Sequence, residues 1–129
     1  MRCFVWKEEG KERKNIEVNI KVNKDELIAE ASEKIQELEE LSGEQRVPLL
    51  NQIGALYYQA EELESAIKYY EESLSIKKEM GKSYTDLMSL YNKKRQQAAE
   101  NKNDEQMNYY MQKVQEMMQM SKDMLRGKM

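Results

Sequence analysis

The amino-acid sequence predicts an all-α protein of about five helices. Residues that end helices and form the turns of β-rich folds are scarce, with five glycines and one proline among 129 residues. Apolar residues recur at separations of three and four over most of the chain, which places them on one face of a helix. At this length the chain is expected to form one helical domain and to bury roughly two-thirds of its unfolded surface.

The first 22 residues have a different pattern. Apolar residues alternate with polar ones from Ile16 to Val22, the period of a half-buried strand. A second β-prone run, Phe4–Trp6, precedes them, and Glu8–Lys11 can form a turn between the two. We therefore predict a β-like segment over residues 1–22, with a short hairpin that needs a helix or another chain to pack on.

Residues 23–129 form the predicted helical domain. Its first helix runs from about Lys24 to Leu41, with Asn23 as the N-cap and Glu26 three residues later. Ser42 and Gly43 end it. Four further helices are expected over about Gln45–Gln59, Leu63–Met80, Ser83–Glu100 and from the capping residue Asn103 to about Leu125.

The second and third of these helices carry a spaced set of large and small residues. Large residues are expected where helices meet, and small ones where backbones approach closely; the set is Leu50, Ile53, Gly54, Tyr57, Ala66, Tyr70 and Ser73. This series resembles the signature of the tetratricopeptide repeat (TPR) family, with one clear repeat at about residues 47–80. The resemblance implies a right-handed superhelix of helical pairs.

The neighbouring units match less well. At one repeat length further on, the positions hold Tyr84, Leu87, Met88 and Tyr91, with methionine in place of the glycine. After an insertion of about seven residues, the second helix of that unit would pack through Met107, Met111 and Val114. Upstream, Ala31, Ile35 and Leu38 fit the second helix of a preceding unit. One regular repeat between two irregular halves is expected.

The resemblance also implies a binding surface. In TPR proteins the first helix of each repeat lines the concave face, which here implies Asn51, Gln52, Ala55, Tyr58, Gln59, Thr85, Asp86, Ser89, Asn92 and Lys93. The familiar carboxylate-ending chaperone tails need lysine and asparagine where this chain has Asn51, Ala55 and Asp86, so such tails are not expected to bind. A neutral-to-basic peptide or helix fits these residues better; the alternative is that they form ordinary polar surface.

The last predicted helix is rich in methionine. Six of the ten methionines lie between residues 107 and 124. One face holds Met107, Met111, Val114, Met118 and Leu125, and an adjoining face holds Met117, Met120 and Met124. So broad an apolar surface indicates either a capping helix with soft core side chains or a surface for a partner or a second copy.

Composition excludes several classes of site. Without histidine, and with Cys3 as the single cysteine, the chain offers no Ser-His or Cys-His nucleophile, no imidazole zinc site and no internal disulfide. No glycine-rich phosphate loop is present. We expect no enzyme activity, no cofactor and no metal site, no membrane span, and a cytoplasmic location.

The charge pattern leaves two interpretations open. Residues 25–80 carry a net charge of −9 between two ends of +3 each. This is either ordinary solvated helix surface or an acidic region that attracts a basic partner or another copy. The short basic run Lys93–Arg95 is weak support for nucleic-acid binding.

Protein binding is the predicted function. An adaptor or assembly factor that holds a short peptide or helix is the first interpretation, on the concave face, on the methionine-rich helix, or on both. A peptide-responsive sensor is the alternative, although residues 1–22 are too short for the usual effector domain.

Overall fold

The computed structural model describes residues 24–127, and these residues are helical with short connections. The all-α prediction is confirmed for this part of the chain. A helix over residues 24–38, the first helix below, precedes η1 (Gly43–Arg46), a single 3₁₀ turn. The longer helices that follow are α2 (Val47–Gln59), α3 (Leu63–Ile76), α4 (Lys82–Glu100) and α5 (Asp104–Leu125). The predicted N-terminal β-hairpin and the Asn23 cap lie outside the described residues.

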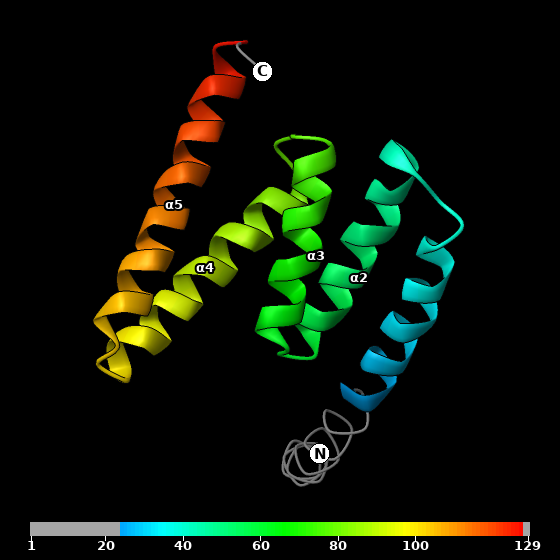
Figure 1. Ribbon diagram of the computed structural model, residues 1–129, viewed down its shortest axis with the longest axis horizontal. Helices are drawn as coiled ribbons and strands as arrows, with labels where there is room; N and C mark the ends of the chain where they lie inside the picture. Colours follow the sequence, from blue (N-terminus) through cyan, green and yellow to red (C-terminus); the bar gives the residue numbers. More distant parts are fainter. Residues whose placement is uncertain (1–23, 128–129) are drawn as a thin grey trace, which may run out of the picture.

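Consecutive helices lie side by side, from the first helix at one end of the molecule to α5 at the other (Figure 1). Two hydrophobic clusters hold them together. One joins the first helix to α2 through Ala31, Leu38, Leu50 and Ile53, and side chains of α3 pack against it. The other joins α3, α4 and α5 around Tyr70, Leu87, Leu90, Tyr91 and Met117. Tyr57 packs against both clusters, so α2 connects the two halves of the core.

The helices α2 and α3 form a closely packed hairpin. Pro48 stands in the first turn of α2, where its missing N–H leaves no helical hydrogen bond unmade. Gly54 faces Tyr70, and a Cβ atom at Gly54 would lie 3.0 Å from carbons of that ring. Ala66 is fully buried and Ser73 nearly so. Small side chains at these positions therefore allow the two helices to approach each other.

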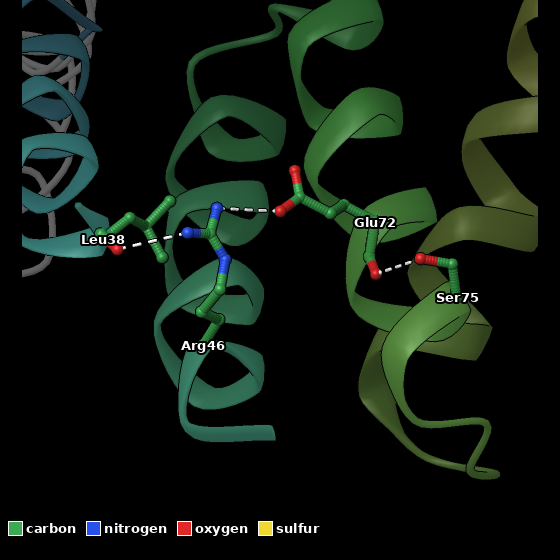
Figure 2. Close-up of polar contacts among 4 residues, drawn as sticks. All are labelled: Leu38, Arg46, Glu72 and Ser75. Atoms are coloured by element: carbon green, nitrogen blue, oxygen red, sulfur yellow. Dashed lines mark hydrogen bonds and ion pairs between the residues drawn. The ribbon is translucent and has the colours of Figure 1, made fainter. Parts of the chain in front are cut away.

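A polar contact fixes the connection before α2. The Arg46 guanidinium donates from Nη1 to the carbonyl oxygen of Leu38, at 3.2 Å, and from Nη2 to Glu72 Oε2, at 2.9 Å. Figure 2 shows that this one side chain reaches the end of the first helix on one side and α3 on the other. Ser75 Oγ donates to the Glu72 carbonyl oxygen at 2.7 Å. Arg46 thus satisfies a carbonyl at a helix C-terminus while it links three segments.

Two helices end earlier than their sequence indicated. The first helix ends at residue 38 rather than at Leu41, after its last buried side chain, and Gly43 then takes a positive φ of 59°. Helix α3 ends at Ile76 rather than at Met80. Residues 77–79 offer no apolar side chain to the core, and Met80 is 49% exposed, so no burial supports a further turn.

The start of α5 agrees with its prediction, but the face it packs does not. Asn103 caps the helix, accepting a hydrogen bond from the Gln106 N–H at 3.1 Å. The triplet expected to pack, Met107, Met111 and Val114, does not form the contact surface, because Met111 is 39% exposed. The side chains that pack on the core are instead Tyr110, Val114 and Met117, a triplet of the same spacing that extends three residues further along the chain.

Across the described residues, no helix is both long and apolar enough to cross a membrane.

Candidate functional site

The residues implied as a binding surface lie on α2 and α4, which contact each other. The closest link among them is between Tyr58 and Lys93, whose Nζ lies 5.1 Å from the centroid of the Tyr58 ring. Tyr58 also packs partly against the core cluster of α3, α4 and α5. The ring is therefore a half-buried platform already covered by a cation, rather than a free aromatic surface.

Two of the expected contact residues have partners within the fold. Asn51 accepts a hydrogen bond at 2.5 Å from the buried Ser73 hydroxyl of α3. Asp86 accepts from the Tyr70 hydroxyl at 2.7 Å and from Lys82 Nζ at 2.8 Å, and its side chain is only 14% exposed. Both side chains hold α3 to its neighbours, so they offer less to a ligand than their place in the sequence implies.

The bond to Asp86 changes the acidity of its partner. Burial raises the pKa of Tyr70 well above its usual range, and the hydrogen bond to the Asp86 carboxylate raises it further. Tyr91, on α4, has a similar arrangement: burial and a hydrogen bond to the Glu71 carboxylate raise its pKa. Both phenols remain protonated in the fold and act as structural donors.

Gln52 and Ala55 line an open depression between the first helix and α2. Its volume is about 290 Å³, and its other walls are Glu30, Lys34 and Leu56. The accessible lining is mainly apolar, with a carboxylate and an ammonium group from the first helix beside it. The structure thus brings these two predicted residues to one usable surface.

Asn92 lines a second depression, between α4 and α5, with a volume of about 190 Å³. The other lining residues are Arg95, Met111, Val114 and Gln115. The Asn92 side-chain amide donates to the Met88 carbonyl oxygen within its own helix, at 3.2 Å. We refer to this depression, with its five lining residues, as the α4–α5 groove.

Three of the expected contact residues remain. Gln59 and Thr85 are exposed, and Ser89 is half-buried. Thr85 Oγ1 donates to the Gly81 carbonyl oxygen at 3.2 Å. None of these three lines a depression described here. Lys93 covers Tyr58. The surface implied by the repeat therefore divides into one depression at each end and a filled centre.

A third depression, larger than these two, lies on another side of α5. It has a volume of about 350 Å³ and contains Lys78, Tyr91, Lys113, Glu116, Met117, Gln119, Met120 and Asp123. Its base is apolar and its rim carries two lysines and two carboxylates. Sequence reasoning assigned no role to Lys78, which stands in the connection after α3.

Arg95 and Gln115 line the α4–α5 groove but were not among the predicted contacts, and Arg95 was considered only as part of the basic run Lys93–Arg95. It stands three residues after Asn92, on the same side of α4, which is the spacing of neighbours on a helix surface. That spacing alone identifies a shared face, but the contact with α5 depends on which face α5 turns towards it.

In residues 24–127, no group of three or more acidic, cysteine or histidine side chains is arranged to hold a metal ion. Comparison with protein-family models, with curated proteins and with solved structures gives no significant match to the chain.

Proposed function

We propose that this chain is a TPR-like protein-interaction module of the cytoplasm, which binds a short segment of another protein and catalyses no reaction. The packing of the α2–α3 hairpin is the observation that carries the proposal. Gly54 against the Tyr70 ring, with Ala66 and Ser73 buried, is the small-and-large arrangement that the repeat signature requires. Side-by-side helices of this kind leave elongated open surfaces rather than enclosed sites.

The depression beside Ala55 and Gln52 is the proposed contact for an extended peptide. Ala55 adds little bulk to α2, and Leu56 next to it supplies apolar surface. Glu30 and Lys34 on the facing helix can pair with main-chain or side-chain groups of a ligand. This site is open and amphipathic, which suits a segment of a few residues with mixed polarity.

A free carboxylate terminus is not the proposed ligand. The position where a clamp needs an asparagine holds Asp86, whose carboxylate is already engaged by Tyr70 and Lys82. Asn51 is bonded to Ser73. A peptide and its C-terminally amidated twin should therefore bind with the same affinity, which isothermal titration calorimetry measures.

The test is a selection from a displayed library of short random peptides on the immobilised protein. Enriched peptides are synthesised and titrated against the wild type, against Ala55→Arg, which fills the depression, and against Ala29→Arg. Ala29 is exposed on another side of the first helix, so Ala29→Arg is the matched control.

We expect Ala29→Arg to leave the dissociation constant unchanged and Ala55→Arg to raise it by about tenfold or more, a loss of roughly 1.4 kcal/mol. Thermal unfolding of both variants checks that the helices remain intact. The proposed peptide site beside Ala55 is wrong if no peptide is enriched over an unrelated helical protein, or if the enriched peptides bind both variants equally well.

A further inference from the structure

Helix α5 presents two apolar stripes, each with a spacing of seven residues. The inward stripe, Tyr110, Met117 and Met124, is partly or fully buried against the rest of the fold. The outward stripe consists of Met111, Met118 and Leu125, which are 39%, 50% and 80% exposed. These three are among the most exposed large apolar side chains of the described residues, and they lie in one row.

The outward row has the spacing of a helix-pairing seam. Together with the half-buried Met107, Val114 and Ser121, it gives separations of four and three residues along all of α5. A repeat of 3.5 residues keeps one line of side chains against a second helix that runs alongside. An extended peptide has a different period and would not match this row. The seam therefore fits a helical partner.

The charges beside this seam are all positive over most of its length. Arg95 lines the α4–α5 groove next to Met111 and Val114, and it makes no ion pair with another described residue. Lys122 follows Met118 by one turn, and Arg126 follows Leu125. The acidic groups of the same stretch of α5, Glu116 and Asp123, line the depression on its other side. The seam thus combines apolar surface with cations that make no ion pair within residues 24–127.

We infer that the outward seam of α5 and the adjoining α4–α5 groove bind an amphipathic helix of another protein, one with acidic side chains beside its apolar face. The inference rests on the proposed function, protein binding, and specifies a different surface and the chemistry of the partner. Apolar contact along the row supplies affinity, and Arg95 and Lys122 select acidic flanks.

A second copy of this chain is a poorer occupant. An antiparallel pair of α5 helices centred on Met118 would bring Lys122 of one copy opposite Val114 of the other, beside its Arg95. A parallel pair would turn the flank of one copy that carries Arg95 towards the Tyr110 and Met117 side of the other, which is already packed on its own core. Like charge opposes the antiparallel arrangement, and this packing opposes the parallel one. The acidic first helix cannot serve instead, because its apolar side is already buried on α2.

The experiment uses a fluorescein-labelled synthetic helix of about three heptads, with leucine at the two core positions and glutamate at the flanking ones. Its twin carries lysine in place of every glutamate. Fluorescence anisotropy with each probe at low concentration gives dissociation constants at about 50 and 300 mM salt. Met80→Gln is the matched control for Met118→Gln, since the two methionines are 49% and 50% exposed.

We expect the glutamate probe to bind about tenfold or more tightly than the lysine twin at low salt, with a smaller ratio at high salt. Met118→Gln should weaken binding, Met80→Gln should not, and Arg95→Gln should reduce the preference for glutamate. Equal binding of the two probes, or no effect of Met118→Gln, would overturn the inference. So would a concentration-dependent dimer in sedimentation that Met118→Gln abolishes.

The Ala55→Arg variant separates this inference from the proposed function. Because Ala55 does not line the groove, its substitution should leave the affinity for the glutamate probe unchanged. If the glutamate probe does not bind but displayed peptides do, only the inference about the seam is wrong. If the probe binds but no peptide is selected, only the peptide site beside Ala55 is wrong.

Discussion

Gly54 lies against the face of the Tyr70 ring so closely that a Cβ atom on Gly54 would approach three ring carbons at 3.0 to 3.1 Å. Tyr70 is only 1% exposed, so its ring has no free space to retreat into. Gly54→Ala gains roughly 1 kcal/mol of helix propensity but separates α2 from α3. We expect a net loss of about 1–3 kcal/mol in the free energy of unfolding, measured by urea denaturation.

Gly81→Ala is the control for that experiment. A Cβ atom at Gly81 would meet nothing within 4 Å, and the backbone there is extended, with φ at −143°. The expected change is below about 1 kcal/mol, mostly from the N-cap preference. A Gly54→Ala variant that is more stable than the wild type by about 1 kcal/mol would mean that the contact with Tyr70 relaxes without cost.

The Tyr70 hydroxyl gives the protein a dependence on alkaline pH. Because burial and Asp86 raise the pKa of Tyr70 in the fold, the folded state keeps this proton above pH 10, where the unfolded chain releases it. The stabilisation is therefore complete below about pH 10 and is lost as pH rises further.

Tyr70→Phe tests this dependence. The variant should lose about 1 kcal/mol at neutral pH, where the hydrogen bond to Asp86 is removed. Its stability should then fall less steeply than that of the wild type above about pH 10, with the remaining slope due in part to Tyr91. Parallel curves from urea denaturation at several pH values would contradict the assignment.

Replacement of Arg46 by lysine should lower the free energy of unfolding. A lysine keeps the charge but cannot donate to Leu38 and Glu72 at once in the planar geometry of a guanidinium. Since the Arg46 and Glu72 side chains are 28% and 37% exposed, we expect Arg46→Lys to cost only about 0.5–1.5 kcal/mol.

In Arg46→Lys, amide hydrogen exchange should increase over the wild type more in the first helix than in α4, because Arg46 holds the end of the first helix. Lys24→Ala is the control: it breaks an exposed pair with Glu62 at 3.8 Å and should change stability by less than about 0.5 kcal/mol. An equal loss of protection from amide exchange in all helices of Arg46→Lys would show that the stabilising effect of Arg46 is not confined to the first helix.

Adjacent methionines on α5 should respond differently to truncation. Met117 is 7% exposed and part of the core, whereas Met118 is 50% exposed. Met117→Ala should lower the free energy of unfolding by about 2–4 kcal/mol, and Met118→Ala by less than about 1 kcal/mol. Equal losses of unfolding free energy in the two variants, measured by thermal or urea unfolding, would contradict the assignment of inward and outward stripes.

Most helix positions could be predicted from local sequence alone. Asn103 and the acidic residues after it mark the start of α5 within a few positions, and capping needs no knowledge of the rest of the fold. The end of α3 was placed four residues late, because whether Ile76 is the last packed residue depends on what lies opposite it. Helix ends set by packing are not visible in local patterns.

The faces of α5 were ambiguous for a related reason. Met107, Met111 and Val114 have the same four-then-three spacing as Tyr110, Val114 and Met117, so spacing alone could not choose between them. Asn51 and Asp86 were expected to face a ligand. Their bonds to Ser73 and Tyr70 join residues 22 and 16 positions apart, and such long-range pairing could not be read from one helix at a time.

One contact bears on redesign of the molecule. The Tyr84 hydroxyl donates at 2.9 Å to the main-chain carbonyl oxygen of Met117, so α5 is held to α4 through an atom that every amino acid possesses. Because this bond needs no particular side chain on α5, substitutions in the outward row should leave the position of the helix along its axis unchanged. The outer face of α5 is therefore a place where a new binding specificity can be designed while Tyr84 holds the helix in position.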